Sequence, residues 1–174
     1  MTEKVLQWEI GGIVFIILLG SFLHFAFELS GYARVVALVA AVNESVWEHL
    51  KLGFWPAVLY ALIEYPFVKR ENFVIAKAVS IYVIPFSIVV LFYVYTAILG
   101  HSILFLDILI FIIAVILGQL ASYKILLAHD FPEWMNVAGA GAAILLAILF
   151  MVFTFYPPHV FLFEDSITGG YGIL

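Results

Sequence analysis

The chain has 174 residues, of which 66% are hydrophobic and 11% are charged, and its mean hydropathy is +1.20. Soluble domains are about 45–50% apolar and about 25% charged, so the composition excludes an ordinary soluble domain and indicates a membrane protein. The net charge of −5 without a basic stripe excludes a nucleic-acid partner, and the lack of cysteine excludes disulfides and thiolate metal sites.

Five stretches are long and apolar enough to be membrane spans, since a spanning helix needs about 20 mostly apolar residues. They cover 10–29, 45–65, 73–99, 103–128 and 134–156. Backbone polar groups in lipid must be satisfied within the segment, so the spans are predicted to be helices of one all-α membrane domain, residues 1–174. The shorter apolar run after Arg34 predicts a re-entrant or interfacial helix between the first two spans.

Local signals place several boundaries and contacts. Ser45-Val46-Trp47-Glu48 fits a capping box with Ser45 as the N-cap, and Pro66 predicts the end of the same helix. Gln119 and Ser122 near the end of the fourth span are expected to make interhelical hydrogen bonds. Glu64 is interpreted as an anchor at the membrane interface.

The positive residues of short loops predict the orientation in the cell membrane. With five spans, one side holds most of them (Lys4, Lys69, Arg70, Lys77 and Lys124) and the other holds Arg34 and Lys51. We therefore expect a cytoplasmic N-terminus and an extracytoplasmic C-terminal tail, residues 157–174.

Residues 42–51 hold the densest polar stretch, with Asn43, Glu44, Ser45, Glu48 and His49 in an otherwise apolar chain. Ionisable residues within spans are rare and usually line a cavity or a pathway. Capping alone explains Ser45 and Glu48, but it does not explain the neighbouring acid, amide and imidazole. The stretch therefore predicts a polar site at the outer end of the second span.

Other ionisable residues are expected at the same end. His24 and Glu28 are four residues apart on the first span and so share a helix face, and Asp107 lies in the first turns of the fourth. His159 follows two prolines in the tail, which is predicted either to fold over the outer mouth, with His159 as a lid residue, or to anchor at the interface. We expect these groups to meet in one pocket.

Imidazole and carboxylate ligands without a thiol suit zinc, iron or manganese. His24, Glu28, Glu48 and His49 are the candidate ligands of such a divalent metal. Either of two further acids is the candidate general base for a metal-bound water, namely Glu44 or Asp107. A purely structural interpretation of the same residues, as capping and interhelical hydrogen-bonding groups, stays open.

These features are compatible with three functions. The first is a metal-dependent intramembrane hydrolase that acts on a lipid or another apolar substrate. The second is a small cation- or proton-coupled transporter or channel subunit, in which the same groups bind ions or exchange protons. The third is a structural membrane protein. Beyond the lipid bilayer, the expected partners are a lipid substrate and further copies of the chain.

The stretch Val42–Lys51, together with residues 23–31, 156–159 and 168–172, resembles a family of small, functionally uncharacterised, multi-pass membrane proteins of bacteria and archaea. The resemblance extends over nearly the whole chain and implies a fold and a polar region. The chain is also loosely similar to the seven-span hydrolases of the alkaline ceramidase and adiponectin-receptor type, which implies a zinc-dependent hydrolase. It departs from them in having five predicted spans and no paired histidines in the last one.

Overall fold

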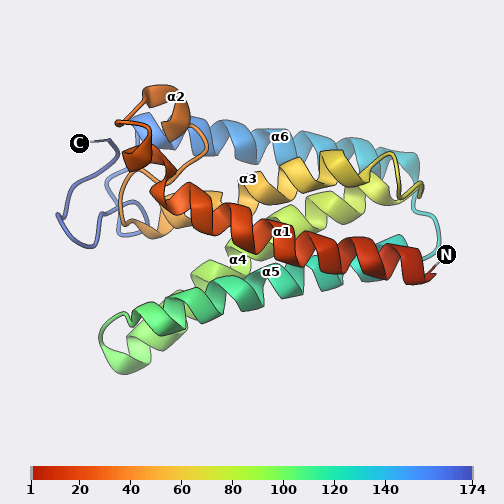
Figure 1. Cartoon of the computed structure of the whole chain (residues 1–174), viewed down its shortest axis with the longest axis horizontal. Helices are drawn as coiled ribbons and strands as arrows, with labels where there is room; N and C mark the ends of the chain where they lie inside the picture. Colours follow the sequence, from red (N-terminus) through yellow and green to blue (C-terminus); the bar gives the residue numbers. More distant parts are fainter. Residues whose placement is uncertain (1, 174) are drawn as a thin grey trace.

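A computed structural model describes residues 2–173, and within that range the regular secondary structure is helical apart from an isolated β-bridge between Glu164 and Tyr171. The helices are α1 (Thr2–Leu29), α2 (Arg34–Ala37), α3 (Val46–Glu64), α4 (Phe73–Leu99), α5 (Leu104–Leu126) and α6 (Glu133–Phe155). The five long helices run lengthwise along one bundle, and the two termini lie at opposite ends of it (Figure 1).

Four helices, α1, α4, α5 and α6, are long and apolar enough to cross a membrane. The prediction of five such spans is therefore wrong by one, because α3 contains Glu48, Lys51 and Glu64 in only 19 residues. α3 has the largest share of buried residues among the long helices and packs against α1, α4 and α6. Its charged groups are therefore surrounded by protein, which satisfies them in a way that lipid cannot.

The predicted re-entrant or interfacial helix is not matched by a re-entrant helix, since α2 is a single turn of four residues. Side chains of α3 form hydrogen bonds with backbone groups of the segment that follows α2. Lys51 donates to the carbonyl of Ala37 at 2.9 Å, and Glu48 accepts from the N–H of Val42 at 3.1 Å. These bonds hold residues 37–42 in an irregular loop against the bundle end, where a longer helix would need those groups for itself.

Close approach of α1 and α3 positions the polar end of the bundle. A Cβ placed on Gly20 would lie 2.4 Å from the carbonyl oxygen of Leu52, so only glycine fits between these two helices. α1 and α3 run in opposite directions (Figure 1). Residues just after Gly20 therefore face residues just before Leu52, which brings His24 opposite His49.

The predicted boundaries and contacts of the other elements are largely confirmed. Ser45 is the N-cap of α3, and that helix ends at Glu64, two residues before Pro66. Gln119 accepts from Ser80 on α4, and Ser122 donates to Glu9 on α1, as interhelical hydrogen bonds. These bonds connect the helices at the end of the bundle that holds the N-terminus.

Candidate functional site

The start of α3 has half of the predicted capping box. The hydroxyl of Ser45 accepts from the N–H of Glu48 at 3.3 Å, but the Glu48 carboxylate does not return to Ser45. Instead the side chain of Asn43 accepts from the N–H of Ser45 at 2.9 Å. Glu44 precedes the N-cap and is therefore outside the helix, so its side chain does not share a helix face with that of Glu48.

Three side chains from two helices and this loop converge at the end of the bundle. The Nε2 atoms of His24 and His49 lie 3.3 Å apart, and the Oε2 atom of Glu44 lies 3.3 Å from His49 Nε2 and 3.9 Å from His24 Nε2. The three side chains are 30–40% exposed. We call His24, Glu44 and His49 the His–Glu triangle.

The orientation of the His49 ring is fixed by the backbone. Its Nδ1 atom lies 2.8 Å from the carbonyl oxygen of Ser45. A carbonyl oxygen only accepts, so Nδ1 holds a hydrogen and the neutral ring directs the Nε2 lone pair into the triangle. That lone pair faces a carboxylate oxygen and a second imidazole, an arrangement that requires either a proton or a metal ion between the three groups.

The carboxylate of Glu44 is held in its charged form. The hydrogen bond that protonated His49 donates from Nε2 is the main reason that the pKa of Glu44 lies below the ordinary value, and the nearby His24 lowers the pKa further. Partial burial and the neighbouring carboxylate of Asp165 act in the opposite direction and are outweighed. Near neutral pH, Glu44 is therefore an anionic donor beside two imidazoles.

Glu48, a predicted metal ligand, lies in a separate buried group. Its Oε2 atom is 2.5 Å from Lys51 Nζ, and its Oε1 atom accepts from the Thr154 hydroxyl at 3.1 Å. Lys51 also donates to Thr154 and to the Ala37 carbonyl, so its three N–H groups are all used. This fully satisfied pair connects α3 to α6 and to the loop after α2.

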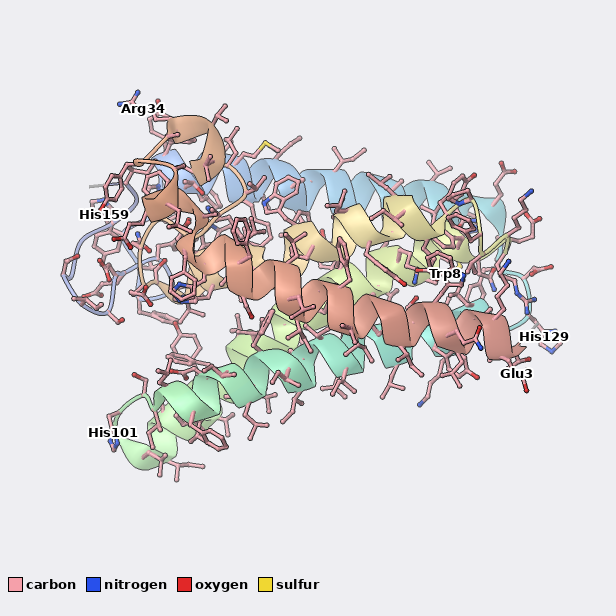
Figure 2. The ribbon with its side chains drawn as sticks, in the orientation of Figure 1. Glu3, Trp8, Arg34, His101, His129 and His159 are labelled. Atoms are coloured by element: carbon pink, nitrogen blue, oxygen red, sulfur yellow. The ribbon has the colours of Figure 1, made fainter. Side chains whose placement is uncertain are left out.

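The remaining predicted residues lie outside the triangle. Glu28 is exposed, near the end of α1. Asp107 accepts from the hydroxyl of Tyr95, at the far tip of the α4–α5 hairpin. His159 is exposed and stacks on Tyr171 within the tail, with ring centroids 4.4 Å apart; Figure 2 shows it near Arg34, at the bundle end opposite Glu3.

The C-terminal tail folds back beside the site. The Asn43 amide donates to the carbonyl of Gly172 at 2.9 Å, and the N–H of Trp47 donates to Leu162 at 3.0 Å. The Phe163 ring is buried against Trp47. Asn43 and Ser45, two further predicted site residues, therefore shape the loop that presents Glu44.

Sequence reasoning missed a second buried polar group, at the N-terminal end of the bundle. Lys77 of α4 lies 2.7 Å from Glu9 of α1 and 2.6 Å from Glu64 of α3. Glu64 is fully buried, so its interpretation as an interface anchor is wrong. These residues come from three helices far apart in the sequence, and no local spacing links them.

Comparisons with curated proteins and with solved structures find no match, so the similarity to alkaline ceramidase and adiponectin-receptor type hydrolases is not confirmed. A model of the family DUF6512, described as a family of unknown function, matches residues 1–173. That range takes in both the His–Glu triangle and the buried group of Glu9, Glu64 and Lys77. The chain therefore belongs to DUF6512, a family of unknown function.

Proposed function

We propose that this membrane protein binds one divalent transition metal ion in the His–Glu triangle and uses it to hydrolyse a substrate at the membrane surface. The observation behind the proposal is the spacing of the three donor atoms, 3.3, 3.3 and 3.9 Å. Two ligands of a tetrahedral zinc ion, each about 2.0–2.1 Å from the metal, are about 3.3–3.4 Å apart. The triangle thus has nearly the dimensions of one face of a zinc tetrahedron.

The donor set favours a catalytic site over a structural one. Two imidazoles and one carboxylate leave the fourth position of the ion open for water, as in catalytic zinc sites, whereas structural zinc sites are closed by four protein ligands. The hydrogen bond from His49 Nδ1 to the Ser45 carbonyl is the outer contact that metal-binding histidines usually make. Zinc and iron(II) both bind two imidazoles and one carboxylate in this way, and manganese also accepts such donors.

The surroundings of the triangle suggest the class of substrate. Phe25, Leu29 and Val35 are 58–75% exposed, on α1 near His24 and on α2. A substrate with an apolar part would be bound by such side chains while its polar bond reaches the metal, which describes a lipid or a similarly amphipathic molecule. His24, Glu44 and His49 would hold the ion, which would supply an activated water for hydrolysis without a separate general base.

Burial of two cations sharpens the proposed orientation. Lys51 and Lys77 are both inside the protein and do not act as topology signals. The positive residues that remain as topology signals are Lys4, Lys69, Arg70 and Lys124 at the N-terminal end of the bundle and Arg34 at the opposite end. By the positive-inside rule, the N-terminus is cytoplasmic and the triangle faces the outside of the cell membrane.

Elemental analysis of the purified protein tests the metal. We expect about one zinc, iron or manganese ion per chain, lost in His24→Ala, His49→Ala and Glu44→Gln. Glu28→Gln is the matched control, because it removes an exposed acid one turn from His24 and outside the triangle. Wild-type protein that takes up no metal, or Glu44→Gln protein that binds it as tightly, contradicts the proposal.

Hydrolysis is tested separately with ester and amide lipids in detergent or vesicles. The metal-loaded protein should release product, and chelation or His49→Ala should abolish the release. If the metal-loaded protein hydrolyses none of these substrates, the hydrolase function is rejected and metal binding alone remains.

A cation- or proton-coupled carrier is a second candidate, and one observation favours it. α1 holds His24 at one end and the buried Glu9 15 residues earlier, so polar groups lie at both ends of one helix about 22 Å apart. Flux of protons and metal ions into proteoliposomes tests this function, and flat traces under both gradients would reject it.

A further inference from the structure

The buried group at the N-terminal end has two acids and one base. Lys77 Nζ lies 2.7 Å from Glu9 Oε1 and 2.6 Å from Glu64 Oε2. Glu9, Glu64 and Lys77 are only 2%, 0% and 5% exposed. If both carboxyl groups were ionised, this region inside the protein would have a net charge of −1.

Two carboxylate oxygens in this group, Glu9 Oε2 and Glu64 Oε1, have no hydrogen-bond donor. Glu64 Oε2 has its 2.6 Å ion pair with Lys77. A buried oxygen without a donor costs free energy, and the cost is larger when it is charged. The group is therefore short of one positive charge and of hydrogen-bond donors.

The neighbouring polar side chains do not supply them. From α5, the neutral Ser122 donates to Glu9 Oε1 at 2.8 Å, and the neutral Gln119 accepts from Ser80 at 3.0 Å. From α3, the titratable Tyr60 donates its hydroxyl hydrogen to the backbone carbonyl of Trp8 at 2.5 Å. The charged and titratable groups around the site are thus Glu9, Tyr60, Glu64 and Lys77.

We propose that Glu9 and Glu64 share one bound proton, so that the group is a proton-binding site. A proton removes the excess charge and turns one acceptor oxygen into a donor. It also needs no space of its own, whereas a metal cation would have to occupy the position between the two carboxyl groups that the Lys77 ammonium already fills. The proton belongs to the pair and is not assigned to one residue.

The Glu48–Lys51 pair provides an internal comparison. It is equally buried, but it has one acid for one base, and both Glu48 oxygens accept hydrogen bonds. That pair is neutral when both residues are ionised and needs no added proton. The difference between the two groups is the second carboxyl group. The proposed proton-binding site does not depend on the proposed metal at the His–Glu triangle.

Loss of the shared proton would leave a buried charge between α1, α3 and α4. Such a state is stable only if a cation enters or the helices move to admit water. Protonation at this end of the bundle is thereby coupled to the entry of a cation or to the movement of the helices. A proton-driven transport step requires such coupling.

Infrared spectroscopy of the protein in lipid tests the proposal through the C=O stretching band of a protonated carboxyl group. We expect the band near neutral pH in the wild type, and its loss in both Glu9→Gln and Glu64→Gln, because each leaves one acid for Lys77. Lys77→Met should roughly double the band, since both acids must then be neutral. Glu28→Gln, at an exposed acid, is the control and should leave the band unchanged.

The thermal stability of the same variants gives a second readout. Glutamine resembles the neutral acid, so Glu64→Gln and Glu9→Gln should fold with unchanged or higher melting temperatures. Glu48→Gln should lower the melting temperature, because it leaves Lys51 without its counter-charge. The proposal is overturned if the wild type lacks the band, if the band survives in both glutamine variants, or if those variants fail to fold.

Discussion

His24 on α1 and His49 on α3 direct their Nε2 atoms at each other across 3.3 Å, although the residues are 25 positions apart in the chain. Two imidazoles at this distance cannot both present lone pairs unless a cation lies between them. Either a hydrogen on one of the two Nε2 atoms or a metal ion joins the rings, and the two states exclude each other. Metal binding should therefore compete with protons.

Acidification should weaken metal binding. Histidine titrates near about 6.5 in model peptides, and a metal ligand must be deprotonated, so zinc affinity should fall by about tenfold or more between roughly pH 7.5 and pH 5.5. The pKa of Glu44 lies below its ordinary value, mainly through its bond to His49, so this carboxylate stays charged across that range. Competition with a chelator at several pH values measures the change. A flat profile would show that the histidines are not ligands.

Replacement of Gly20 by alanine should separate the two histidines. The new Cβ would lie 2.4 Å from the backbone oxygen of Leu52, so α1 must move away from α3. Since His24 is one turn further along α1, we expect weaker metal binding and a loss of stability of about 1–3 kcal/mol. Gly141→Ala is the matched control, because its Cβ meets no atom within 4 Å. Equal metal affinity in both variants would contradict the positioning role of Gly20.

Lys51→Met should destabilise the protein strongly. It leaves the buried Glu48 carboxylate without its counter-charge, and breaking a buried pair in this way costs about 3–5 kcal/mol. Adding Glu48→Gln to the same chain should restore much of the stability, because the amide oxygen can still accept from Thr154. Thermal unfolding in detergent compares the variants. A double variant less stable than Lys51→Met alone would show that charge imbalance is not the cause.

The C-terminal tail should loosen in acid. Burial tends to raise the pKa of Asp165, but hydrogen bonds from the Thr168 hydroxyl and the Ile167 N–H outweigh it and hold the pKa below 3.8. The folded pKa is lower than the unfolded one, so the stabilisation is present above pH 3.8 and is lost as the pH falls through the folded value. Asp165→Asn should produce the same loosening at neutral pH.

Amide hydrogen exchange across residues 160–172 measures that loosening. Glu164→Gln is the control, because Glu164 is exposed and its contact with the Tyr171 hydroxyl is long, at 3.4 Å. Exchange in Asp165→Asn that matches both the wild type and this control would show that the Asp165 carboxylate does not hold the tail.

Several features of the polar end follow from the sequence, because they depend on neighbouring residues. The capping hydroxyl of Ser45 and the end of α3 before Pro66 are local effects, and both are present. The same local argument fails for Glu44 and Glu48. A spacing of four places two residues on one face only if both are helical, and Glu44 precedes the N-cap. Glu44 therefore meets the histidines, while Glu48 turns to Lys51.

The sequence by itself determined that this is an all-helical membrane protein with a polar region at residues 42–51, because hydropathy and capping act over one or two turns. Only the tertiary structure decided which charged groups meet. The proximity of Gly20 to Leu52 aligned the two histidines, and the crossing of three helices placed Glu9, Glu64 and Lys77 together. Burial inside the bundle also let α3 keep charges that a lipid-facing helix would exclude, since protein groups replace the water that lipid cannot provide.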